Sequence, residues 1–301
     1  MVSGPALVLA LLPDFALILL GAGLRRGLRL GDHFWNGLEK LVYFVLFPAL
    51  LFNGLVRTRI DWSAAAPMVG AAAGAMGIGM MLGLALRRLP IPPLSFASQY
   101  QCAFRFNSYI GLAVAGSLYG TEGIAAMGIL VGIMVPPANM AAVWMLARHG
   151  DAGLWRELGR NPLIWATLAG LAANAMGLSP PPVLLKFLGR LGEAAIVLGL
   201  LAVGAGLRMN DNGGAAQRVA ATYLLSVKLA AMPLAALLLV RWLGLAGIHA
   251  DVVLIFAALP PASSAYILAQ RMGGDGPRVA WLVSAGTLLG MLSLPFVLAL
   301  R

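Results

Sequence analysis

Four hydrogen-bonding side chains interrupt an otherwise apolar segment between residues 98 and 120. They lie within eight positions of one another and are Gln101, Arg105, Asn107 and Ser108. An Arg at the depth of a lipid bilayer costs several kcal/mol unless it meets a partner or water. Its guanidinium is a planar fork of donors that matches a carboxylate. The segment therefore predicts an interrupted helix that lines a cavity, in which Arg105 binds an anion.

A second interruption lies between residues 257 and 274, in the other half of the chain. Pro260 and Pro261 break the helix there, because proline lacks the amide N–H and its ring clashes with the preceding turn. Half-helices expose unpaired N–H and C=O groups at such breaks, and helix N-termini attract anions. Hydroxyl side chains beside this break either contact the ligand or cap the half-helices: Ser263, Ser264 and Tyr266. Two interrupted helices, one in each half, predict a transport site between them.

Three more ionisable side chains fall within apolar segments, namely Asp14, Glu193 and Lys228. Each is a candidate for carrying a coupled ion, and each is equally a candidate for a buried structural pair. Arg105 itself would be structural if it paired with Asp14 or Glu193. Both alternatives stay open at this point.

Metal, disulfide and nucleotide chemistry find no support in the sequence. Cys102 is the single cysteine, and His33, His149 and His249 fall in expected loops without ligand spacing. No GxSxG, HExxH, P-loop or GxGxxG motif occurs. No metal site and no cofactor are therefore predicted.

The composition is that of a membrane protein. The 301 residues are 60% hydrophobic and only 11% charged, against about 25% charged in soluble domains. The mean hydropathy is +0.88. The net charge of +10 lies mostly in short loops, which favours the positive-inside pattern over nucleic-acid binding.

Ten segments approach the roughly 20 residues that a bilayer requires, so we expect an all-α polytopic protein with ten transmembrane helices. The predicted spans are Pro5–Leu24, Phe34–Val56, Ala64–Leu86, Pro93–Tyr119, Gly123–Ala147, Pro162–Leu178, Val183–Leu207, Ala216–Leu243, Ala250–Met272 and Pro277–Leu300. The first of them has no basic n-region and no clear cleavage site, so it is expected to be a span and not a signal peptide.

The loop charges predict the orientation. With the N-terminus outside, twelve Lys and Arg residues lie in inside loops: Arg25, Arg26, Arg29, Arg87, Arg88, Arg148, Arg156, Arg160, Arg208, Arg218, Arg271 and Arg278. Six lie outside: Arg57, Arg59, Lys186, Arg190, Arg241 and Arg301. The excess predicts a multi-pass protein with both termini outside.

The two halves of the chain resemble a repeat. An offset of 157 residues aligns Pro5 with Pro162 and Asn107 with Ser264. The repeats are expected at residues 1–150 and 151–301, with a short polar connector at about 148–161. Since each half holds five spans, the second half must enter the membrane from the opposite side, which is the inverted-repeat plan of secondary transporters.

Four segments resemble the auxin efflux carrier family, which includes the plant PIN-type carriers and many bacterial members. They are LEKLVYFVLFPALLF from Leu38, FRFNSYIGLA from Phe104, GRNPLIWATLAGLAAN from Gly159 and LPPASSAYILAQRMGGD from Leu259. The resemblance covers nearly the whole chain. It implies ten helices in two inverted five-helix repeats, with broken helices four and nine crossing, and transport of organic carboxylates such as auxin, malonate or malate.

The family pattern transfers only in part. The plant carriers have Leu-Pro-Asn at the first crossing, where the Asn contacts the carboxylate; here Arg105, Phe106 and Asn107 stand there, so Asn107 alone transfers. Leu259 and Pro260 match the family's second crossing. The third span lacks the charged support residues of the plant carriers, and their long central loop is absent.

These patterns predict a secondary transporter or facilitated carrier of a small organic anion, working by alternating access, as an elevator or by rocking, at the crossing of helices four and nine. It would lie among the lipids of a bacterial inner (plasma) membrane. Coupling to protons or sodium and assembly as a homodimer are left open. One alternative is a sodium-coupled symporter of the bile-acid transporter type. An intramembrane protease is disfavoured, because Asp14 is the only plausible Asp within a span and every His falls in an expected loop. A receptor role would leave the two interrupted helices unexplained.

Overall fold

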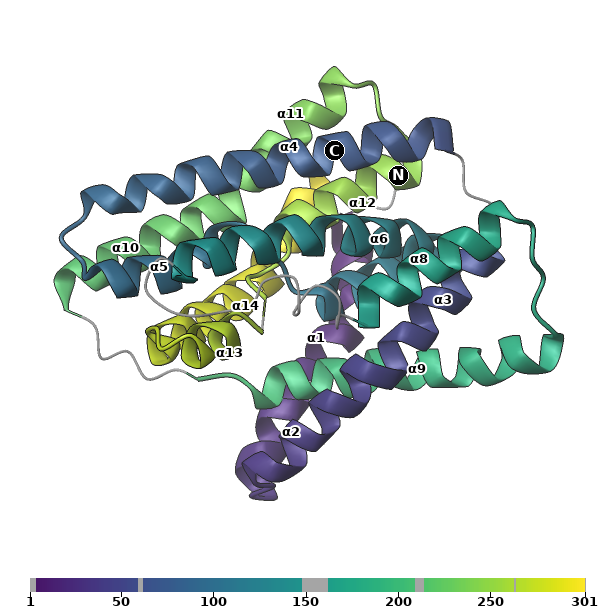
Figure 1. Cartoon of the computed structure of the whole chain (residues 1–301), viewed down its shortest axis with the longest axis horizontal. Coiled ribbons are helices and arrows are strands. Elements are labelled where there is room, and N and C mark those ends of the chain that lie inside the picture. The colour runs from purple at the N-terminus through teal and green to yellow at the C-terminus, as the bar shows by residue number, and fades with distance from the viewer. Residues whose placement is uncertain (1–3, 59–61, 148–161, 209–213, 263, 301) are drawn as a thin grey trace. The chain divides into compact units, whose positions relative to one another are not determined.

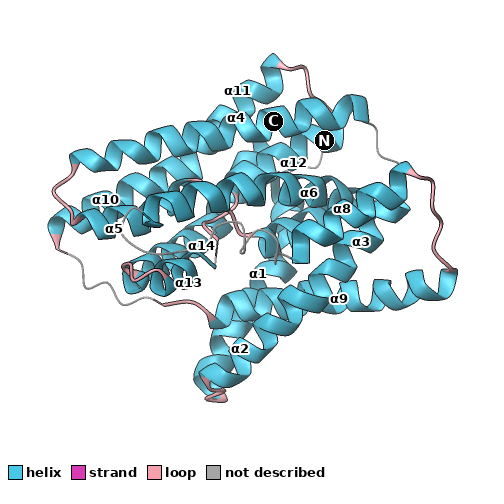
Figure 2. Cartoon of the chain, in the orientation of Figure 1, coloured by secondary structure: helices cyan, strands magenta, loops and turns pink. Residues whose placement is uncertain are grey.

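The computed structural model describes residues 4–58, 62–147, 162–208, 214–262 and 264–300. All regular secondary structure in these ranges is helical (Figure 2). In chain order (Figure 1), the elements are α1 (Gly4–Gly27), α2 (Asp32–Leu41), η1 (Val42–Leu46), α3 (Phe47–Arg57), α4 (Trp62–Leu84), η2 (Ala85–Arg88), α5 (Pro93–Tyr100), η3 (Gln101–Ala103), α6 (Ser108–Ala147), α8 (Pro162–Ala175), α9 (Pro182–Ala205), α10 (Ala215–Ser226), η4 (Val227–Ala231), α11 (Met232–Trp242), α12 (Gly247–Ala258), α13 (Ser264–Arg271) and α14 (Gly276–Ala299). Helices satisfy the main-chain hydrogen bonds internally, as an apolar environment demands.

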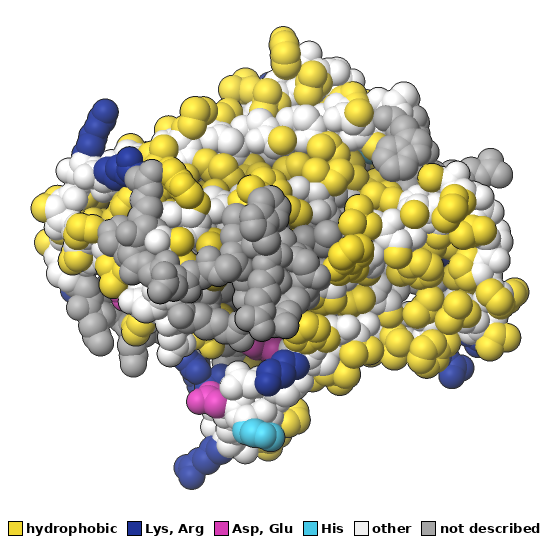
Figure 3. All heavy atoms as spheres, viewed as in Figure 1, with side chains coloured by type: hydrophobic (Ala, Val, Ile, Leu, Met, Phe, Trp, Pro, Cys, Tyr) yellow, Lys and Arg dark blue, Asp and Glu magenta, His cyan; other side chains and the backbone are white. Residues whose placement is uncertain are grey.

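Six helical stretches among the described residues are long and apolar enough to cross a membrane. They are Asp32–Arg57, Ala65–Arg88, Pro93–Ala147, Pro182–Ala205, Ala215–Trp242 and Gly276–Ala299. Large apolar side chains on these stretches are exposed, including Phe44, Trp144, Leu234 and Phe296. Hydrophobic side chains make up much of the face shown in Figure 3. So much exposed apolar surface is stable only against lipid or another apolar surface, so the protein is a multi-pass membrane protein. The total of ten spans stays a prediction.

The observed helices match several predicted spans and differ at two boundaries. The predicted span Pro162–Leu178 ends early, because α8 stops at Ala175 and Leu178 N–H donates to Ala173 O (2.9 Å). That bond is typical of a helix closed by a glycine, here Gly177 with φ 64°. The predicted fourth and fifth spans are joined in α6, which is interrupted at Gly120 (φ 57°, ψ −139°). The connector 148–161 lies outside the described residues.

Two π-helical turns lie directly before prolines. η1 is followed by α3, with Pro48 in its first turn, and η4 is followed by α11, with Pro233 in its first turn. A proline has no N–H for the α-helical ladder and its ring crowds the carbonyl one turn earlier. A wider turn accommodates this without ending the helix. Lys228 lies inside η4, so this turn sets the direction in which its side chain projects.

The chain forms two compact units. Unit 1 comprises Met1–Ala66, Ser108–Ile133 and Arg160–Gly206, and unit 2 comprises Pro67–Asn107, Met134–Gly159 and Leu207–Arg301. Each unit therefore draws segments from both predicted repeats. The division into repeats at residues 1–150 and 151–301 stays a prediction.

Unit 1 is built on close helix packing. Helix α1 packs against α9, and α3 packs against both α8 and α9. Gly21 and Gly204 let the α1 and α9 backbones approach, since a Cβ at Gly204 would overlap the main chain of Ile18. Asn174 of α8 holds the end of α3 by donating to Leu55 O (2.7 Å).

Unit 2 contains both predicted interruptions. Helix α13 packs against α14, and α12 packs against α11 and α14. The glycine-rich helix α4 lies close to η3 and to η4–α11, since a Cβ at Gly79 would meet Ala103 O and the Met232 side chain. The phenol of Tyr223 in α10 donates to Leu82 O of α4 (2.7 Å). The elements that lead into the first break, and those on both sides of the second break, are thereby joined within unit 2.

Candidate functional site

The first break separates η3 from α6. Helix α5 tightens into the 3-10 turn η3, and Phe104 leaves the helical region with φ −137° and ψ −25°. The helix resumes at Ser108. The interruption expected around Arg105 is thus present, and residues 104–107 are non-helical.

The second break follows α12. That helix ends at Ala258, Leu259 is extended with φ −58° and ψ 142°, and α13 begins at Ser264. The residue before a proline is driven out of the helical region, which explains the conformation of Leu259. Pro260 and Pro261 are buried and lie against Gly290 and Gly286 of α14, where no side chain is in the way. The interruption predicted from the two prolines is therefore observed.

The two breaks contact each other inside unit 2. The Asn107 N–H donates to Pro260 O at 3.0 Å. The rings of Phe106 and Phe256 meet edge to face, with centroids 4.5 Å apart. Residues 153 positions apart thus join at the point where both helices lose their own hydrogen bonds. The bond satisfies one orphan donor and one orphan acceptor.

Arg105 ties the first break to the second. Its Nη1 donates to Gln101 Oε1 (2.6 Å) and its Nη2 donates to Ser264 Oγ (2.9 Å). Gln101 Nε2 in turn donates to Ser98 O (3.1 Å) and Ala265 O (3.2 Å). Arg105 is only 7% exposed and Gln101 is fully buried. A guanidinium is held at this depth by neutral oxygens of both half-helix regions.

The remaining predicted residues lie at different depths. Asn107 is buried, Ser108 and Tyr266 are half-buried, and Ser264 is exposed. Ser108 opens the part of the chain assigned to unit 1. Ser263 lies outside the described residues. The structure thus brings together Arg105, Gln101, Asn107, Pro260 and Ser264. Pro261 is the next residue after Pro260 and packs against Gly286.

The three candidate coupling residues have distinct surroundings. Lys228 is fully buried, and its Nζ donates to Ala257 O (3.0 Å) and lies 3.6 Å from Met232 Sδ. Asp14 is buried in unit 1 and accepts from Ser117 Oγ (2.8 Å). Glu193 is exposed on α9. Of the three, Lys228 is the residue that donates a hydrogen bond to α12, the helix that ends at the second break.

Unit 2 also holds a polar cluster that the sequence patterns did not indicate. Ser95 Oγ donates to Asp275 Oδ2 (2.7 Å) and accepts from the side-chain amides of Gln99 (2.9 Å) and Gln217 (3.0 Å). Asp275 also caps α14 by accepting from Arg278 N–H (3.2 Å). The cluster joins α5, α10 and the start of α14. It joins segments that are far apart in sequence, so no local pattern indicated it.

The two breaks offer hydrogen-bond donors and a positive charge, which are groups that can hold an anion. A buried guanidinium and main-chain amides at helix breaks bind carboxylates through charge-assisted hydrogen bonds. Arg105 provides the charge, while Asn107 and Ser264 provide nearby amide and hydroxyl groups.

Comparison with known proteins supports a transport role. A family model described as "Membrane transport protein" matches residues 148–298. A protein of Rhizobium meliloti (strain 1021) named "Putative malonate transporter" is 26% identical over 311 residues, with 94% of each chain covered. A protein of Methanothermobacter thermautotrophicus named "Uncharacterized transporter" is 26% identical over 289 residues, with 93% of each chain covered.

Proposed function

The chain belongs to the membrane transport protein family, which is the auxin efflux carrier family that its motifs resemble, and we propose that it carries a small organic anion across the membrane. The observation that carries this proposal is the junction of two broken helices around a buried guanidinium. Asn107 N–H bonds to Pro260 O, and Arg105 bonds to Ser264. Burying a charged side chain within a membrane costs several kcal/mol, and such residues typically mark substrate pathways in membrane proteins.

We infer a carboxylate as the substrate class. A guanidinium can hold a carboxylate in two parallel hydrogen bonds, and it would exchange its neutral partner Ser264 for the charged ligand. The name of the Rhizobium relative points to a small dicarboxylate such as malonate. The substrate site would comprise Arg105, Asn107 and Ser264 with Gln101, Ser108, Pro260, Pro261, Ser263 and Tyr266.

The proposed mechanism is alternating access at the breaks, by elevator or rocking motion. Broken helices leave main-chain groups that a passing ligand can use, and they bend at fixed points. Lys228, Glu193 and Asp14 are the candidates for coupling to protons or sodium. Among them Lys228 is favoured, because it bonds to Ala257 one residue before the end of α12.

The test is transport by purified protein in liposomes. Labelled malonate, malate and an indole carboxylate should be taken up faster than into protein-free liposomes. The matched uncharged control is malonamide, which keeps the size of malonate but lacks the carboxylates. Imposed sodium and proton gradients identify the coupling ion. Equal uptake of malonamide and malonate, or uptake of no carboxylate, would contradict the proposal.

We also propose that both termini lie outside the cell membrane, from the twelve inside and six outside cations of the sequence. Several of these cations, including Arg59, Arg148 and Arg301, lie outside the described residues. A tag placed after Arg301 should react with an impermeant label on intact cells. Labelling only after the cells are opened would reverse the orientation.

A further inference from the structure

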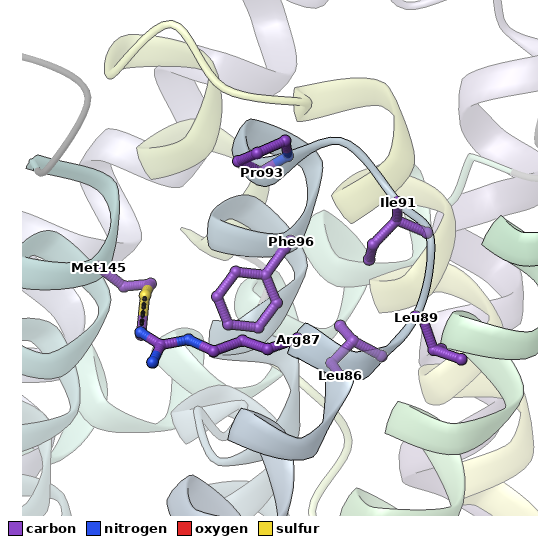
Figure 4. A pocket seen from close by; sticks show the side chains of 7 residues that line it. All are labelled: Leu86, Arg87, Leu89, Ile91, Pro93, Phe96 and Met145. Carbon is purple, nitrogen blue, oxygen red and sulfur yellow. Dashed lines mark hydrogen bonds between the residues drawn. The ribbon is translucent and has the colours of Figure 1, made fainter.

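A cavity of about 260 Å³ opens in unit 2 where α4 and η2 end and α5 begins. Its wall is mostly apolar and is formed by Leu86, Leu89, Ile91 and Pro93 together with the ring of Phe96 (Figure 4). Met145 of α6 closes the remaining side. The lining residues that the structure describes include no Asp or Glu. The cavity is separate from the two breaks, since none of the break residues lines it.

Arg87 brings a positive charge to this apolar wall. Its guanidinium carbon lies 5.5 Å from the centre of the Phe96 ring, and its Nη2 lies 3.9 Å from Met145 Sδ (Figure 4). These contacts hold the side chain across the cavity while using little of its donor capacity. Among the described residues, no carboxylate pairs with Arg87. An oxyanion is the partner that its planar fork of donors would accept.

The cavity lies at the ends of two membrane-crossing stretches. One stretch ends at Arg88 and the next begins at Pro93, so we expect the lining residues near the level where lipid headgroups meet the hydrocarbon. Arg88 is exposed beside Arg87 and adds a second cation at the same level. Basic pockets between helices at this level suit phosphate headgroups.

We propose that this cavity binds an anionic phospholipid. The lipid phosphate pairs with Arg87, and the first part of an acyl chain lies against Leu89, Ile91 and Phe96. A volume of about 260 Å³ falls just below the roughly 300–1,000 Å³ of pockets that enclose a whole small ligand. It fits a ligand of which only part enters the protein while the rest stays in the bilayer. A free anion would leave the apolar wall without a partner.

The experiment measures lipid bound to the purified full chain by native mass spectrometry. Dioleoyl phosphatidylglycerol is compared with dioleoyl phosphatidylcholine, which has the same chains and no net charge. The anionic lipid should bind more tightly to the wild type. Arg87→Gln should weaken that binding about tenfold or more, because a hydrogen bond between charged groups is lost. Arg26→Gln is the matched control, since Arg26 is an exposed Arg at the end of α1.

A second pair of variants tests the apolar wall with Arg87 intact. Ile91→Trp fills the cavity and should also remove the bound lipid, whereas Leu94→Trp places the same ring at an exposed position outside the lining. Four results would overturn the proposal. Three of them are equal binding of the two lipids, an equal loss in Arg26→Gln, and full competition by glycerol phosphate, which would indicate a site for soluble anions. The fourth is retention of lipid by Ile91→Trp, which would show that this cavity is not the site.

Discussion

Arg105→Ala is expected to weaken the binding of a small carboxylate about tenfold or more and to lower the thermal stability of the protein. Hydrogen bonds that involve a charged group contribute about 1.5–3 kcal/mol each, and about 1.4 kcal/mol is a factor of ten. The same guanidinium bonds to Gln101 Oε1 (2.6 Å) and Ser264 Oγ (2.9 Å), so its removal also takes away one of the contacts between the two breaks. Affinity and melting temperature should be measured on the same purified variant.

Two further variants distinguish the effect of the Arg105 charge from the effect of its hydrogen bond to Ser264. Arg105→Lys keeps the charge but cannot reach two acceptors in a fork, so it should restore affinity only in part. Ser264→Ala removes the bond to Arg105 Nη2 and leaves the charge, so it should lower stability with a smaller loss of affinity than Arg105→Ala. Arg190→Ala, at an exposed position of α9, controls for the loss of a cation.

The opposite outcome has a clear meaning. If Arg105→Ala melts early yet binds carboxylates normally where it is folded, Arg105 is a structural residue that joins the breaks. The proposal of anion transport would then lose its main physical basis, although membership of the transporter family would stand.

The broken helices could be predicted because their causes are local. Pro260 and Pro261 forbid a continuous helix, and the polar residues from Gln101 to Ser108 do not suit a lipid-facing one. The observed breaks fall at these places, between Ala103 and Ser108 and between Ala258 and Ser264. Local chemistry does not determine that the two breaks contact each other, because the bond from Asn107 to Pro260 depends on the packing of distant segments.

The other hydrogen bonds of the site could not be predicted, because most of them join residues that are far apart in the sequence. The sequence suggested an ion pair or a ligand for Arg105 and did not indicate its hydrogen bonds to Gln101 and Ser264. The cluster of Ser95, Gln99, Gln217 and Asp275 joins residues up to 180 positions apart. Single polar residues near helix ends are common, so such a network becomes recognisable only when the helices are packed.

The π-helical turns could be predicted only in part from the sequence. Pro48 and Pro233 fall inside predicted spans, and a proline within a helix can kink, break or widen it. In both places the helix widens just before the proline, in η1 and η4. The outcome depends on the helices that pack beside the turn, and α12 and α14 pack against η4.

Lys228→Met is expected to reduce carboxylate transport about tenfold or more while changing thermal stability little. Lys228 Nζ donates to Ala257 O (3.0 Å), near the negative end of the α12 helix dipole, and Ala257 is three residues before Pro260. Three residues span at most about 11 Å, so the ammonium lies near the proposed anion site. At an effective dielectric constant of about 20, two unit charges on the order of 10 Å apart interact by about 1–2 kcal/mol.

In Lys228→Met the favourable and unfavourable changes in folding free energy nearly cancel. A loss of transport in this variant would therefore not be explained by a loss of stability. Removing a Lys from the middle of a span relieves about 2.5–3.5 kcal/mol, whereas leaving the Ala257 carbonyl without its donor costs about 1–3 kcal/mol. Methionine also matches the length of the lysine stem and suits the contact with Met232. Lys40→Met, at an exposed position of α2, is the matched control and should transport normally. A Lys228→Met protein that transports at the wild-type rate would show that this ammonium serves only to satisfy the end of α12, and coupling would have to be sought at Asp14 or Glu193.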